Sequence, residues 1–297
     1  ISLSEYISGL TTDPKKVAAP KVAIVYANGQ VMDGSGTDDN IYGYTLSETL
    51  RKVAEDDDIK SVVVRVNSPG GSAFGSEQMW FAAKQLRAKK PLIVSMSDYT
   101  ASGGYYMSCI ADTIVAQPTT LTGSIGIFGM FPNFAGVADK IGVNFSTVKT
   151  NEIADLGNTM RPMTDSERAI IQNHVNRGYE LFISRCAEGR GMTQDAIKAI
   201  GEGRVWLGVD AVKIGLVDEI GNINSAINKA VELAQLGQYE LVYYPEKKDS
   251  FEELMKMFDQ STPEEQLINN IRDFASAPHF KCDDEPYGGV IKKYLKR

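Results

Sequence analysis

Four short runs of apolar, mostly β-branched residues recur along the first 120 positions, and stretches with a helical repeat separate them. The runs are Lys21–Ala27, Ser61–Asn67, Pro91–Met96 and Asp112–Gln117. Between them, residues 45–55 and 75–89 repeat their apolar positions about every 3.6 residues. Strands that alternate with helices, and that are apolar on both faces, are typical of a parallel sheet covered by helices. The sequence therefore predicts an α/β fold.

The second half of the chain is more helical. "TDSE" (Thr164–Glu167) has the pattern of a capping box and predicts the start of a long helix. One face of that helix reads as a stripe directed at the core, formed by Ile171, Val175, Tyr179, Phe182 and Cys186. A helix at 223–236 and a strand at 240–244 are also expected. We predict a leader or linker at 1–20, a main domain at 21–237, and a C-terminal strand with a helical extension for oligomer contacts at 238–297.

Composition limits the classes of partner and cofactor. The chain has 297 residues, 43% of them hydrophobic, and a net charge of −7, which argues against a nucleic-acid partner. No apolar run approaches the roughly 20 residues that span a bilayer. The two histidines are too few for a histidine-rich metal site, and we expect no metal or cofactor. Cys109 and Cys186 lie in apolar contexts and read as core residues. Their spacing neither requires nor excludes a disulfide.

One serine stands out for its position. "SDYTASGGYYMS" places Ser102 among small residues where a strand gives way to a helix, a corner at which enzymes hold nucleophiles. The strand at 61–67 runs into "NSPGGS", whose two glycines can turn backbone amides into a pocket. Both features fall at the carboxyl ends of strands, where open α/β sheets bind ligands. The pattern is consistent with acyl transfer, with Ser102 as nucleophile and the amides of Gly71 and Gly103 as oxyanion donors. Tight helix–sheet packing would explain the same glycines.

A nucleophilic serine also needs a base. Nothing around His174 or His279 recommends either histidine. A desolvated lysine is an alternative base, but the sequence does not rank its lysines by burial.

Three motifs together resemble the signal peptide peptidase A (protease IV) family. They are "RVNSPGGS", "DYTASGGYYMSCIADTIVAQPTTLTGSIGI" and "GRVWLGVDAVKIGLVDEIG", and the likeness runs from about Val22 to Leu236. It implies a crotonase-like and Clp-protease-like ββα spiral. It also implies a serine peptidase with a Ser–Lys dyad that degrades cleaved signal peptides. On this chain the nucleophile falls on Ser102 and the oxyanion donors fall on Gly71 and Gly103.

The resemblance also indicates where the substrate groove lies, and it shows one position at which this sequence departs from the family pattern. "LTGSIGIFG" resembles a segment beside the substrate groove, and we expect Ile125, Ile127 and Phe128 to contact apolar substrates. Short family members carry the lysine about fifty residues after the serine, where this chain has Ala154. Lys149 is five residues too early and is only a weak candidate.

Long family members contain two tandem units, with the lysine in the first unit and the serine in the second. This chain has the serine without the lysine and begins at Ile1 rather than Met. We therefore expect it to be the C-terminal half of a long-form peptidase, whose N-terminal half supplies the base. The resemblance further implies a homo-oligomer, with a tetramer as the expected size, at the bacterial cytoplasmic membrane. The catalytic domain would lie on the outer (periplasmic) face, and the fragment itself is expected to be soluble.

Two alternatives remain at this stage. A crotonase-type acyl-CoA hydratase or isomerase would use the same oxyanion geometry without a nucleophile. A non-catalytic repeat could persist as a scaffold for assembly.

Overall fold

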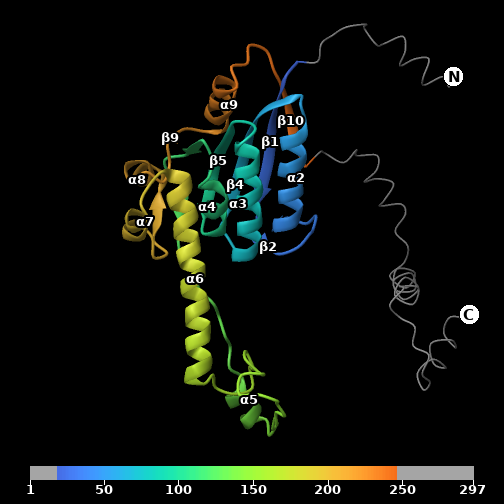
Figure 1. Ribbon diagram of the computed structural model, residues 1–297, viewed down its shortest axis with the longest axis vertical. Helices are drawn as coiled ribbons and strands as arrows, with labels where there is room; N and C mark the ends of the chain where they lie inside the picture. Colours follow the sequence, from blue (N-terminus) through green and yellow to red (C-terminus); the bar gives the residue numbers. More distant parts are fainter. Residues whose placement is uncertain (1–18, 246–297) are drawn as a thin grey trace, which may run out of the picture. The chain divides into compact units, whose positions relative to one another are not determined.

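The computed structural model describes residues 19–245, and the four strands that the sequence predicts in the first 120 positions are present. Strands β1 (Lys21–Asn28), β4 (Ile59–Ser68), β5 (Leu92–Ala101) and β6 (Thr113–Ala116) are parallel neighbours in that order. β9 (Glu219–Ile220) extends the sheet beyond β6. The predicted α/β fold with a parallel sheet is confirmed (Figure 1).

The central strands are buried on both faces. Alternate residues of β1 and β4, such as Ala23 and Val62, pack in the main core with α2 (Gly43–Glu55) and α3 (Ala73–Arg87). The intervening residues, such as Ile24 and Val63, pack on the other face with α9 (Ile223–Leu233). This two-sided burial explains why the strands read as continuous apolar runs rather than alternating ones.

The strand at 240–244 belongs to the main sheet. β10 (Glu240–Tyr244) pairs in parallel with β1 along its whole length, from Lys21–Glu240 to Val25–Tyr244. The compact unit therefore ends at Pro245, later than the boundary at 237 that we predicted. The predicted leader, apart from Ala19 and Pro20, and the predicted helical extension lie outside the described residues.

β5 is longer than predicted, and this positions the site. It continues past Met96 to Ala101 because a short strand, β7 (Leu121–Gly123), pairs in parallel with its last three residues. β7 also pairs antiparallel with β8 (Val205–Leu207). Two further short strands, β2 (Val31–Met32) and β3 (Ile41–Tyr42), form a separate parallel pair.

The long helix α6 (Asp165–Arg190) begins with the predicted capping box, in which Thr164 and Glu167 bond reciprocally. Its two halves differ. Phe182 and Cys186 in the second half are fully buried, whereas Ile171, Val175 and Tyr179 are only half-buried. The predicted core stripe is therefore correct only for the second half of the helix. The first half leads to a segment that carries α5 (Ala135–Lys140) (Figure 1).

Three short helices complete the described unit. α4 (Gly103–Ser108) follows β5 directly, and α7 (Gln194–Ile200) precedes β8. α8 (Gly208–Lys213) lies between β8 and β9. In the described part of the chain, no helix is both long and apolar enough to cross a membrane.

Candidate active site

Ser102 occupies a strained corner between β5 and α4. Its backbone has φ 51° and ψ −119°, a conformation that costs a residue with a side chain on the order of 1 kcal/mol or more. The Ser102 N–H donates to the Gly123 carbonyl (2.9 Å), and the Ser102 carbonyl accepts from Tyr106 N–H (2.8 Å). The hydroxyl does not cap the helix that follows. The fold thus fixes the backbone of this serine on both sides and leaves its hydroxyl available.

The glycine turn after β4 lies directly against this corner. A Cβ placed on Gly70 would come within 2.7 Å of the Ser102 Cβ and 2.6 Å of the Gly103 nitrogen. A Cβ on Gly103 would lie 3.3 Å from the Gly71 nitrogen. Only glycine allows the two segments to approach so closely, which explains the residue types in both motifs.

β2 holds the glycine turn in place. Val31 N–H donates to the Gly70 carbonyl (2.9 Å), and Ser72 N–H donates to the Val31 carbonyl (2.8 Å). Neither of these bonds uses the Gly71 N–H. Within residues 19–245, neither it nor the Gly103 N–H donates a backbone hydrogen bond. Two unused amides beside a serine hydroxyl are the arrangement that can stabilise an oxyanion.

A cleft of about 1010 Å³ opens in front of Ser102. The glycine turn and α4 form one side, and residues of α6 and of the 202–203 loop form another. Its lining comprises Gln30, Pro69, Gly70, Gly71, Ser72, Ala73, Ser76, Ser102, Gly103, Tyr106, Ser124, Gly126, Ile127, Phe128, Gln172, Val175, Asn176, Tyr179, Phe182, Glu202 and Gly203. The wall is mostly uncharged and partly aromatic, which suits an apolar peptide better than a charged one.

The three residues predicted to contact substrate lie in different environments in the structure. Ile127 and Phe128 line the cleft, and Phe128 is 85% exposed. Ile125 is fully buried in the main core and does not line the cleft, which corrects our expectation for this residue. The Ile125 carbonyl instead accepts from Gly203 N–H (2.9 Å) and so holds the opposite loop.

The sequence did not single out two further residues of the cleft. Ser124 follows β7 and has a left-handed backbone, with φ 49°. Tyr106 stacks on Phe182, with ring centroids 4.4 Å apart, and donates its hydroxyl to Glu77 (2.7 Å). The Gly–Ser step in "LTGSIG" is the only signal for Ser124 in the sequence, and by itself it indicates only a turn.

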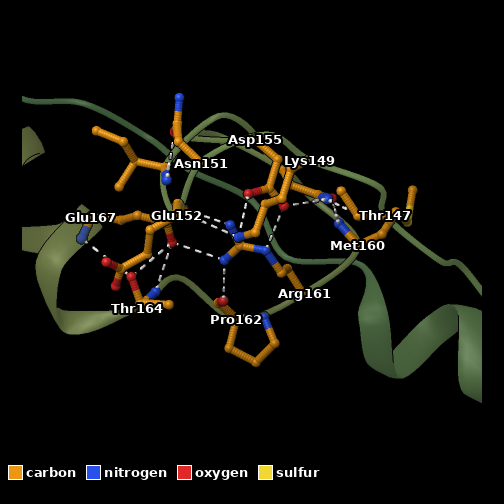
Figure 2. Close-up of polar contacts among 12 residues, drawn as sticks. Thr147, Lys149, Asn151, Glu152, Asp155, Met160, Arg161, Pro162, Thr164 and Glu167 are labelled. Atoms are coloured by element: carbon orange, nitrogen blue, oxygen red, sulfur yellow. Dashed lines mark hydrogen bonds and ion pairs between the residues drawn. The ribbon is translucent and has the colours of Figure 1, made fainter.

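Lys149 forms its hydrogen bonds outside the cleft. Its ammonium group donates to the Glu152 carbonyl (2.7 Å) and to Asp155 (3.0 Å), as Figure 2 shows. Ala154, the counterpart of the lysine in short family members, belongs to the same turn-rich segment. Neither residue lines the cleft.

A guanidinium clamp holds the segment that carries Lys149. Arg161 donates to Asp155 (2.8 Å) and to both carboxylate oxygens of Glu167 (Figure 2). Arg161, with help from the Thr164 backbone N–H, lowers the pKa of Glu167 to about 2. Arg161 and Lys149 likewise lower the pKa of Asp155. Through Asp155 and Glu167, the clamp joins this segment to the start of α6. Lys149 forms its ion pair with Asp155 of the same clamp.

No lysine or histidine from the described residues lines the cleft. Glu202 is the only charged residue of its lining. His174 is exposed on α6 outside the lining, and His279 lies outside the described residues. Between residues 19 and 245, no three His, Cys, Asp or Glu side chains gather in a way that could hold a metal ion.

The sequence profile of Peptidase family S49 matches residues 84–237, which include Ser102 and most of the cleft. The chain belongs to peptidase family S49. S49 is a serine peptidase family, and this assignment favours a peptidase over an acyl-CoA enzyme.

Among S49 relatives, Protease 4 of Haemophilus influenzae is 40% identical over 240 residues, which are 80% of this chain and 39% of that protein. The chloroplastic serine protease SPPA of Arabidopsis thaliana is 37% identical over 221 residues, covering 73% and 33%. The chain thus spans about two fifths or less of these relatives. A relative from Methanocaldococcus jannaschii is 34% identical over 230 residues, covering 75% of this chain and 74% of its own.

One solved structure with a similar fold is a peptidase of another name. A membrane-bound stomatin-specific protease, 1510-N, aligns with a TM-score of 0.50 and 16% identity, covering 78% of this chain and all of that one. At this identity the likeness shows the shared α/β fold and nothing about substrate.

Proposed function

We propose that this chain supplies the nucleophile and the oxyanion hole of a serine endopeptidase of the signal peptide peptidase type. The observation that carries the proposal is the strained Ser102 against the unused amides of Gly71 and Gly103, in a cleft of an S49 chain.

The reaction follows from that geometry. The Ser102 hydroxyl attacks the scissile carbonyl while a base takes its proton. The oxyanion that forms accepts hydrogen bonds from the Gly71 and Gly103 amides, each of which contributes on the order of 3 kcal/mol in comparable sites. The protonated base then gives its proton to the leaving amine. Water hydrolyses the acyl ester on Ser102 and restores the hydroxyl.

The base, in this proposal, is a lysine from polypeptide outside residues 19–245. The described cleft is lined by no lysine or histidine, and Lys149 is bonded to Asp155. The relatives named Protease 4 are more than twice as long as the stretch that aligns here. We place the lysine in a preceding unit of the same protein, set against Ser102. Burial of that lysine beside the mostly uncharged wall would lower its pKa toward neutrality.

The substrates we propose are apolar peptides, cleaved signal peptides among them. Support comes from the apolar and aromatic residues of the cleft lining, among them Ile127, Phe128, Tyr106, Tyr179 and Phe182. Signal peptides carry an apolar core and small residues near their cleavage site.

We further propose that the protein acts as a homo-oligomer, with a tetramer as the expected size. Its site would be the bacterial cytoplasmic membrane, with this domain on the outer (periplasmic) face. Support for an assembly comes from apolar side chains left exposed between residues 128 and 148: Phe128, Met130, Ile141, Phe145 and Val148. Contiguous exposed apolar surface is a common mark of an interaction site.

The test compares two proteins on one apolar peptide substrate: residues 1–297 alone, and a longer protein that adds a preceding unit. The longer protein should hydrolyse the peptide and lose that activity on Ser102→Ala, whereas residues 1–297 should be poorly active or inactive. Full activity of residues 1–297 that is lost on Lys149→Ala would place the base within this chain. A longer protein with no activity would favour the scaffold alternative.

A further inference from the structure

Two buried cysteines from different helices meet behind the cleft. Cys109 ends α4, and Cys186 lies in the second half of α6. Both are free thiols with no exposed surface, and both belong to the main core cluster. The chain has one other cysteine, Cys282, which lies outside the described residues.

A glycine brings the two helices together at this point. A Cβ on Gly189 would lie 2.1 Å from the Cys109 carbonyl oxygen, so α6 rests directly on the Cys109 peptide group. Cys186 precedes Gly189 by three residues and therefore faces the same side of the helix. The Cys109 thiol donates to the Tyr106 carbonyl (3.1 Å), and both cysteines are fully buried in the same core cluster. Phe182 stacks on Tyr106 and Gly189 rests on Cys109, so Cys186 lies on the same face of α6 between these two contacts with α4.

We propose that Cys109 and Cys186 form a disulfide that fastens α4 to α6. The reaction is an exchange in which a small-molecule or protein disulfide accepts two electrons and leaves as two thiols. The two protein thiols give up their protons as the sulfur–sulfur bond forms. Cys282 takes no part.

The bond would connect the two sides of the cleft. α4 begins next to Ser102 and carries Tyr106, which stacks on Phe182 one turn before Cys186. The closed loop of roughly 80 residues contains Ser124, Ile127 and Phe128. Loop closure of that length constrains the unfolded chain strongly and raises the melting temperature by on the order of 10 °C.

Burial also determines when the bond forms. Burial, with a contribution from neighbouring Cys109, raises the pKa of the Cys186 thiol, so it stays protonated and unreactive in the folded protein. Exchange with an external disulfide therefore occurs while the chain folds or when α6 opens locally. An experiment that adds oxidant only to the folded protein would miss it.

The test refolds the 297-residue chain from denaturant in glutathione buffers of increasing oxidised fraction. Remaining thiols are blocked with an alkylating agent, and the pairs are mapped by mass spectrometry. We expect the Cys109–Cys186 peptide to be the dominant cross-link, with Cys282 alkylated or bound to glutathione. Free Cys109 and Cys186 under conditions that oxidise Cys282 would overturn the proposal. Cross-links to Cys282 at equal frequency would do the same.

Melting temperatures of the oxidised and reduced chains, and of two matched cysteine variants, provide a second test. The oxidised refolded chain should melt on the order of 10 °C above the reduced chain. Cys186→Ala should abolish this difference, and Cys282→Ala should keep it. A redox difference that survives Cys186→Ala, or a wild-type chain with no difference, would contradict the proposal. The wild-type comparison stands even if the Cys186 variant folds poorly.

Discussion

Gly71→Ala is the most informative change to the proposed oxyanion hole. Gly71 has φ +151°, which residues with a side chain rarely adopt, and an added Cβ would lie 2.2 Å from the Val31 carbonyl oxygen and 2.9 Å from the Val31 nitrogen. Both neighbours are backbone atoms, so no side chain can rotate away. The turn must shift, and its bonds to β2 must stretch or break.

The magnitudes follow from these contacts. An unfavourable backbone conformation costs about 1–3 kcal/mol, and each lost hydrogen bond to Val31 costs about 1 kcal/mol. Turning the Gly71 N–H away from the oxyanion should lower kcat by roughly 10²–10³-fold. KM should change much less, because the oxyanion forms only in the transition state.

Gly191→Ala is the matched control. Gly191 caps α6 with a left-handed backbone (φ +62°), and nothing lies within 4 Å of its added Cβ. This variant should lose about 1 kcal/mol of stability with unchanged kcat. The assay is steady-state hydrolysis of an apolar peptide by the longer protein, with thermal unfolding in parallel. A Gly71→Ala protein that loses stability but keeps wild-type kcat would refute the assignment of the Gly71 amide to the oxyanion hole.

Three further predictions concern Ser102, Lys149 and Glu167. Ser102→Ala and Ser102→Gly should both abolish hydrolysis, and residual turnover in either variant would argue against a nucleophilic role. Only the glycine variant should gain stability, up to about 1 kcal/mol, because glycine tolerates the positive φ at this position. Lys149→Ala should leave hydrolysis within roughly twofold of wild type, because Lys149 bonds Asp155 outside the cleft, and loss of activity would contradict the external base. Glu167→Gln should lower the melting temperature at neutral pH. The Glu167 pKa is depressed from 4.5 to about 2, so its contribution is complete above the ordinary value and is lost as pH falls toward 2. The difference in melting temperature between wild type and Glu167→Gln should therefore narrow on acidification, and a constant difference would contradict the clamp.

The sequence predicts much of the framework because local patterns determine it. Apolar runs that are buried on both faces mark β1, β4, β5 and β6, and the capping box at Thr164 marks the start of α6. The corner at Ser102 is also readable, because small residues between a strand and a helix indicate a tight turn.

Long-range pairing accounts for what the sequence does not predict. Residues 97–101 are polar and read as a turn, yet they extend β5 because β7 pairs with them from a later part of the chain. The burial of Ile125 and the exposure of Phe128 likewise depend on how the chain leaves β7, which composition does not reveal. The sequence also does not predict the ion pair of Lys149 with Asp155, because that pair depends on the fold of the whole segment.

Covalent labelling tests the central claim most directly. The longer protein is treated with a fluorophosphonate, which reacts with activated serines, and the modified residue is located by mass spectrometry. The proposed mechanism predicts one modified site, Ser102, no labelling of the Ser102→Ala variant, and at least roughly tenfold slower labelling of Gly71→Ala. Stoichiometric labelling of another serine, with Ser102 untouched in an active protein, would contradict the assignment.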